Sequence, residues 1–142
     1  MPRNPDVIFR AFKGTLEHLC EVPTGGFRLK SSWFRVTGGG VSVDDGELSS
    51  AEETYERNKP CGVASISKAK LAELGFAIVP DPQDTTEDLL RNPAHRVVPG
   101  VGSKDCKRIT ASAVIEICLE GWQVVGAGGS AGRAPKSHLT GV

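Results

Sequence analysis

The chain has 142 residues, of which 39% are hydrophobic and 24% charged, so it is long enough for one hydrophobic core and short for two. Its 17 basic and 17 acidic side chains cancel, which disfavours a uniformly basic nucleic-acid-binding protein or an acidic disordered chain. The apolar run Phe76–Val79 is far shorter than the roughly 20 residues of a membrane-spanning helix, and no hydrophobic stretch of secretory length follows Met1. We therefore expect a cytoplasmic protein without membrane contact.

The first third of the chain predicts short strands. Val7 to Phe12 has the apolar, β-prone content of a strand, and Thr15 to Cys20 predicts a short helix. After a turn at Pro23 to Gly26, bulky and polar residues alternate, so residues 26–43 predict a small antiparallel unit. Its strands are expected at Phe27–Leu29, Trp33–Val36 and Val41–Val43, with a glycine break at residues 38–40.

The middle of the chain alternates helices and strands. Ser49 and Ser50 precede Glu52 and Glu53 by three residues, a pattern typical of a capping box that opens a helix to about Asn58. A strand is expected next at Cys61–Ile66, followed by a helix that Ser67 caps, that runs through Leu74 and that Gly75 ends. A strand at Phe76–Val79 and a helix at 84–91 are expected after it.

The last third predicts one long helix. After a strand at His95–Val98, apolar residues recur at three- and four-residue steps from Ser103 to Glu120, which is typical of an amphipathic helix. A strand at Trp122–Val125 follows. Because strands outnumber helices and mix with them irregularly, we predict an α+β fold, with a mixed or antiparallel sheet and two to four helices. A single domain is expected over residues 1–125, with a flexible glycine-rich tail over 126–142.

The four cysteines show no metal-binding spacing. Cys20, Cys61, Cys106 and Cys118 form neither a CxxC pair nor a Cys/His knuckle, so no metal is expected and all four are interpreted as structural thiols. Cys106 and Cys118 are expected on one apolar stripe of the long helix.

Three arginines in or beside the early strands are candidates for binding phosphate or carboxylate, because the planar guanidinium matches both groups. For Arg28 and Arg35, strand alternation favours a position in solvent. Arg10 differs, because Ile8, Arg10 and Phe12 share one strand face and both faces of that strand are largely apolar.

A second candidate anion site lies where the long helix begins. Gly100, Gly102, Ser103 and Lys104 combine glycines, unpaired helix N–H groups and positive charge, as a nucleotide cofactor or phosphate requires, although the full phosphate-loop motif is missing. The alternative is a plain loop in which Ser103 caps the helix. His95, which follows Asn92-Pro93-Ala94, is either a proton carrier or a partly buried histidine bonded to backbone.

Several short motifs resemble those of a recurrent type of small, functionally uncharacterised bacterial protein. They are Phe9-Arg10-Ala11-Phe12, Phe27-Arg28 with Trp33-Phe34-Arg35, Gly40-Val41-Ser42-Val43, Gly62-Val63-Ala64 and Asn92-Pro93-Ala94-His95, and the resemblance covers roughly residues 7–100. An arginine on the first strand, followed by a glycine-broken hairpin and a serine, is also similar to the RES and ADP-ribosyltransferase class of NAD-consuming toxins. That resemblance implies that Arg10 and Ser42 hold NAD and that a later glutamate supports cleavage of its glycosidic bond; Glu52, Glu53 and Glu73 all fall on predicted exposed helices.

Two functions follow as hypotheses. The first is a small toxin-like enzyme that acts on NAD or another phosphate-bearing nucleotide, with Arg10, Ser42 and His95 as its catalytic residues. The alternative is a non-catalytic module that binds a protein partner. Specific binding of nucleic acid is not expected.

Charge is sorted along the chain although its sum is zero. Residues 1–36 carry six basic and three acidic side chains, residues 37–88 four and eleven, and residues 89–142 seven and three. This sorting predicts that the basic early strands and the entrance of the Gly100–Arg108 helix meet around an anion.

Overall fold

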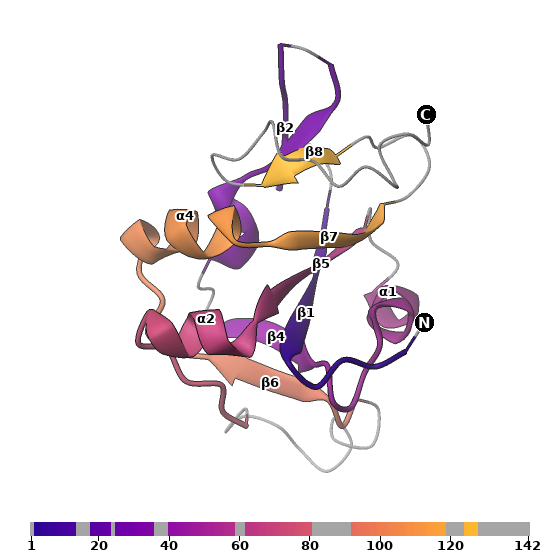
Figure 1. Ribbon diagram of the computed structural model, residues 1–142, viewed down its shortest axis with the longest axis vertical. Coiled ribbons are helices and arrows are strands. Elements are labelled where there is room, and N and C mark those ends of the chain that lie inside the picture. The colour runs from indigo at the N-terminus through magenta and orange to yellow at the C-terminus, as the bar shows by residue number, and fades with distance from the viewer. Residues whose placement is uncertain are drawn as a thin grey trace.

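A five-stranded antiparallel sheet forms the body of the protein, in the strand order β6-β4-β1-β5-β7 (Figure 1). The computed structural model describes residues 2–13, 18–23, 25–35, 40–58, 62–80, 92–118 and 124–127. The strands of this sheet are β1 (Val7–Phe12), β4 (Val41–Asp45), β5 (Gly62–Ser67), β6 (His95–Val98) and β7 (Val114–Cys118).

A second, three-stranded sheet lies beside the first (Figure 1). In it, β2 (Leu19–Glu21) pairs antiparallel with β3 (Phe27–Leu29), and β3 pairs parallel with β8 (Val124–Ala127). Residues 126–127, expected in a flexible tail, therefore belong to this sheet, and the rest of the predicted tail lies outside the described residues. The helical piece predicted to Cys20 is wrong at its end, because Leu19 and Cys20 lie in β2.

Helices cover the larger sheet, which confirms the predicted α+β fold. Helix α1 (Ala51–Asn58) packs on β1, β5 and β7, α2 (Lys68–Glu73) follows β5 directly, and α4 (Ser103–Ala111) packs on the 3-10 helix η1 (Ser31–Phe34). The predicted capping box is confirmed, since Glu53 N–H donates to Ser50 Oγ at 3.1 Å and Ser50 N–H donates to Glu53 Oε1 at 2.8 Å. In the described part of the chain, no helix has the length and apolar character needed to cross a membrane.

The helix predicted from Ser103 to Glu120 is wrong beyond Ala111. Ser112 ends α4, and Val114 begins the edge strand β7. The β-branched Val114, Ile115 and Ile117 favour a strand, and their apolar spacing also fits the predicted helical stripe. Cys118 therefore lies in β7, on a different element from Cys106.

The antiparallel unit predicted over residues 26–43 is also wrong, because β3 and β4 belong to different sheets. Trp33 and Phe34 lie in η1 instead of a strand, and both are fully buried. A strand would point neighbouring side chains to opposite faces, whereas one tight helical turn places both rings in the same core.

Two smaller predictions have different outcomes. Phe76–Val79 is not a strand and makes only the single bridge Val79↔Val97. Ser67 does cap α2, since its Oγ accepts from Lys70 N–H at 3.2 Å, and Gly75 follows with φ of +93° as the left-handed stop. The helix predicted at 84–91 lies outside the described residues.

Candidate functional site

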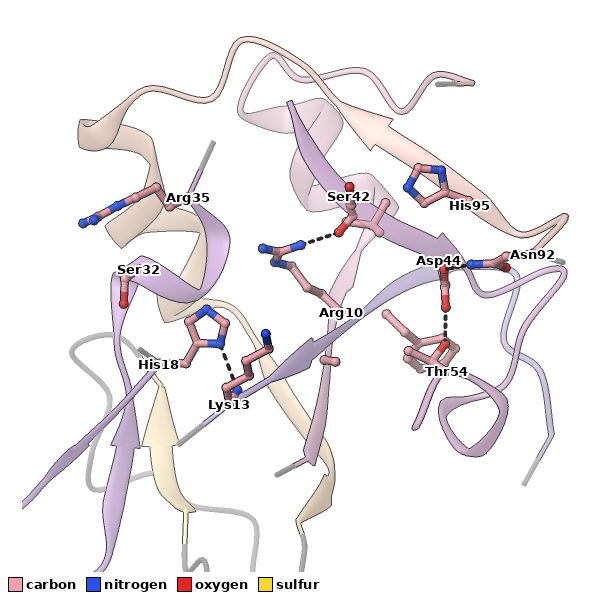
Figure 2. A pocket seen from close by; sticks show the side chains of 13 residues that line it. Arg10, Lys13, His18, Ser32, Arg35, Ser42, Asp44, Thr54, Asn92 and His95 are labelled. Atoms are coloured by element: carbon pink, nitrogen blue, oxygen red, sulfur yellow. Dashed lines mark hydrogen bonds between the residues drawn. The ribbon is translucent and has the colours of Figure 1, made fainter. Parts of the chain in front are cut away.

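A cleft of about 720 Å³ opens where β1 and β4 part (Figure 2). The two strands are paired only at Ile8↔Asp45 and Phe9↔Asp44, and beyond Phe9 they diverge. The lining residues come from β1, η1, β4, α1 and the start of β6, and from the residues beside β1, β2, η1 and β6. They are Phe9, Arg10, Ala11, Lys13, His18, Ser32, Arg35, Ser42, Val43, Asp44, Thr54, Asn92 and His95.

The side chain of Arg10 lies in the opening between β1 and β4. Its Nε donates to the carbonyl oxygen of Trp33 at 2.6 Å, and its Nη1 donates to that of Ser42, also at 2.6 Å. The indole Nε1 of Trp33 donates in return to the carbonyl oxygen of Arg10 at 3.3 Å. As the alternation predicts, Arg10 lies on the same strand face as the core residues Ile8 and Phe12.

The guanidinium of Arg10 has no carboxylate partner among the described residues. Because burial removes water from the charged form, the pKa of Arg10 is lowered to about 10, and the group still carries its charge at neutral pH. Two backbone carbonyls use two of its five N–H groups. Among the described residues, the charge of this partly buried cation is therefore balanced by backbone dipoles only.

Two more cations lie at one end of the cleft. Lys13 and Arg35 are exposed, and in the described structure neither side chain makes an ion pair. His18 lies between them, with Nδ1 accepting the backbone N–H of Lys13 at 2.9 Å (Figure 2). This bond joins the end of β1 to the segment before β2.

Asp44 is the one carboxylate among the described lining residues, and it is only 5% exposed. Its Oδ2 accepts from Thr54 Oγ1 at 2.7 Å and forms an ion pair with Arg57 Nη2 at 2.8 Å. Its Oδ1 accepts from Asn92 Nδ2 at 3.0 Å, and Asn92 Oδ1 accepts from Ala94 N–H at 3.2 Å. Asp44 thus ties α1 and the turn before β6 to β4.

The three predicted catalytic residues line this one cleft (Figure 2). Arg10 lies at its centre, the exposed side chain of Ser42 lies on β4, and His95 begins β6 opposite Asp44 in the strand register. Of the other two arginines, Arg35 lines the cleft and Arg28 does not; Arg28 Nη2 lies 3.4 Å from Cys20 Sγ.

The predicted cofactor-binding residues lie elsewhere. None of Gly100, Gly102, Ser103 and Lys104 lines the cleft, so the helix entrance and the basic strands do not meet there. Gly102 is the N-cap of α4 and Ser103 its first residue. Gly102 N–H donates to Asp105 Oδ2 at 3.0 Å, so the chain's own carboxylate occupies the N-terminus that a phosphate would need.

The sequence analysis did not identify Lys13, Ser32, Asp44 and Thr54 as cleft residues. The alternation Val41-Ser42-Val43-Asp44 could have indicated that Asp44 continues the strand and shares a face with Ser42. Lys13 and Ser32 carry no comparable local signal, because only the tertiary fold brings them together.

In the described residues, no group of three or more histidine, cysteine or acidic side chains is placed to hold a metal ion. Comparisons with protein-family models, with curated proteins and with solved structures find no match. Function is therefore inferred from the geometry of the cleft.

Proposed function

We propose that the cleft binds a small phosphate-bearing ligand of the nucleotide class, with NAD as one candidate. The observation that carries the proposal is the guanidinium of Arg10, which lies partly buried at the centre of the cleft without a carboxylate partner in the described structure. An unpaired buried cation is costly, and a bound anion would offset that cost.

The chemistry of Arg10 suits phosphate. Its Nε and Nη1 bonds to two backbone carbonyls hold the guanidinium plane in place, so little side-chain freedom remains to be lost on binding. A phosphate oxygen that accepts from its remaining N–H groups forms charge-assisted hydrogen bonds. Lys13 and Arg35 add positive charge at the same cleft. Its volume of about 720 Å³ is within the range of small-molecule sites.

The other lining groups suit the uncharged parts of a nucleotide. The Ser42 hydroxyl is exposed in the cleft and could bond a ribose hydroxyl, and His95 offers a second polar contact or a proton carrier. Cleavage of a glycosidic bond in NAD would also need an acidic group, and Asp44 already accepts bonds from Thr54, Arg57 and Asn92. The proposal is therefore limited to binding of the ligand. Whether the protein also cleaves NAD is tested in a separate experiment.

Calorimetric titration with ADP and with NAD tests the proposal. We expect saturable binding that weakens about tenfold or more when Lys13→Gln and Arg35→Gln are combined, since two charged contacts are removed. The matched control combines Lys104→Gln and Lys107→Gln, two exposed cations of α4 outside the cleft. This control should leave the affinity unchanged, and it also tests the helix entrance as a rival site. Equal weakening in both variants, or no binding at all, contradicts the proposal.

Incubation of the wild-type protein with NAD, followed by chromatography, separates a binding protein from an enzyme. We expect intact NAD to be recovered, because the cleft's carboxylate is held in structural bonds. Release of nicotinamide that is lost in Arg10→Met would instead assign the toxin-like enzyme that the sequence resemblance implies.

A further inference from the structure

The polar groups of the cleft are sorted along its length (Figure 2). One end, here called the cationic end, consists of Lys13, His18, Ser32 and Arg35. The opposite end, here called the hydrogen-bonding end, consists of Ser42, Asp44, Thr54, Asn92 and His95.

Arg10 lies between the two ends and is bonded toward both. Its Nε donates to Trp33, the neighbour of Ser32 at the cationic end, and its Nη1 donates to Ser42 at the hydrogen-bonding end. A phosphate bound to Arg10 therefore finds further unpaired cations in only one direction among the described lining residues, that of Lys13 and Arg35.

The hydrogen-bonding end offers a phosphate no unpaired cation among the described lining residues. Its one charged lining residue, Asp44, is a buried carboxylate that accepts from Thr54 and Asn92, and its ion pair with Arg57 at 2.8 Å balances its charge. A phosphate placed at this end would therefore lack the charge-assisted bonds that the cationic end supplies. The exposed hydroxyl of Ser42 suits a hydroxyl or amide group instead.

We infer that the ligand lies lengthwise in the cleft, with all its phosphates at Arg10 and the cationic end and its uncharged, hydroxyl-bearing part at the hydrogen-bonding end. This inference rests on the proposed function and narrows it to nucleotides that carry their phosphates on one side, such as nucleoside 5′-mono- and diphosphates. It therefore favours ADP over NAD, whose diphosphate lies between two nucleosides. Compounds with phosphates at both ends are disfavoured, because a phosphate at the hydrogen-bonding end has no unpaired cation to bind among the described lining residues.

A matched pair of ligands tests the orientation with the wild-type protein. ADP and adenosine 3′,5′-bisphosphate share the same nucleoside and both carry two phosphate groups, but the bisphosphate has one at each side of the ribose. In calorimetric titrations at the same pH and salt, we expect ADP to bind at least tenfold more tightly. Adenosine, which has no phosphate, should bind more weakly than ADP.

The combined variant Lys13→Gln and Arg35→Gln supplies the second measurement. Both side chains are exposed and form no ion pair in the described residues, so the fold should be unaffected. We expect the ratio of the two affinities to fall toward one. A bisphosphate that binds the wild type as tightly as ADP overturns the orientation and leaves the proposed function standing, whereas failure of both ligands to bind overturns both.

Discussion

Arg10 and Asp44 are opposite charges that line the same cleft, and their surroundings differ. Asp44 is 5% exposed and accepts from Thr54, Arg57 and Asn92, so its charge and its hydrogen-bonding capacity are used within the protein. Arg10 is bonded to two neutral carbonyls and has no acidic partner among the described residues. The comparison separates a charge that holds the walls of the cleft together from one that remains available to a ligand.

The difference has a consequence for stability. An ion pair that also satisfies its hydrogen bonds is costly to break, because removal of one member leaves the other buried and alone. An unpaired buried cation contributes little stability, and a site can retain it for function at that cost. Chemical denaturation measures the free energy of unfolding and so shows whether substitutions of the two residues differ as their contacts indicate.

The largest effect is expected for Asp44→Ala. The substitution removes the carboxylate that accepts bonds from Thr54, Arg57 and Asn92, so the free energy of unfolding should fall by about 3 kcal/mol. A loss below about 1 kcal/mol would show that Asp44 does not anchor the cleft.

An intermediate effect is expected for Thr54→Val. Valine keeps the shape of this 1%-exposed residue but cannot donate to Asp44, so the loss should be about 1 to 2 kcal/mol. Arg57 and Asn92 remain bonded to the carboxylate, which makes the loss smaller than in Asp44→Ala. Equal losses in the two variants would mean that the bonds of Asp44 to Arg57 and Asn92 add nothing beyond the bonds of the Thr54 hydroxyl to Asp44 and Ser49.

A smaller stability effect, with a large effect on binding, is expected for Arg10→Met. Loss of two hydrogen bonds is offset by removal of an unpaired buried charge, so the free energy of unfolding should change by about 1 kcal/mol or less. The affinity for ADP should nevertheless fall about tenfold or more, because the central charged donor is lost. A stability loss as large as that of Asp44→Ala would make Arg10 a structural anchor as well.

The sequence predicted the contents of the sheet better than its connections. Strand alternation correctly placed Arg10 beside Ile8 and Phe12, and the capping box at Ser50 and Glu53 marked the start of α1, because both signals are local. The end of α4 was missed. The spacing of Ile109, Ala113 and Ile117 fits one continuous helix, and it fits equally well the change from helix α4 to strand β7 that the structure has.

The candidate site shows the same division between local and tertiary information. Arg10, Ser42 and His95 were selected from short motifs, and the fold brings them to one cleft. The pairing of Asp44 with Arg57 and Asn92 depends on contacts across 13 and 48 positions in the chain, which no local pattern specifies. The predicted anion site at Gly102 depended on unoccupied helix N–H groups, and Asp105 accepts from the Gly102 N–H.

The smallest effect is expected for the exposed ion pair of Arg3 and Glu53, which provides a surface reference for the partly buried pair of Asp44 and Arg57. The bond from Arg3, together with that from the Ser50 N–H, lowers the pKa of Glu53 to about 2. Since the folded pKa lies below the usual value near 4.5, the stabilisation is present above pH 4.5 and is lost as pH falls toward 2.

Glu53→Gln isolates this charge, because glutamine can still accept the Ser50 N–H in the capping box. Between pH 5.5 and pH 3, the wild type should lose more free energy of unfolding than the variant does. The difference should stay below about 1 kcal/mol, since the two side chains are 52% and 43% exposed and solvent screens the pair. Identical losses in the two proteins would mean that the Arg3 contact contributes nothing, whereas a difference as large as that of Asp44→Ala would remove the distinction between exposed and buried pairs.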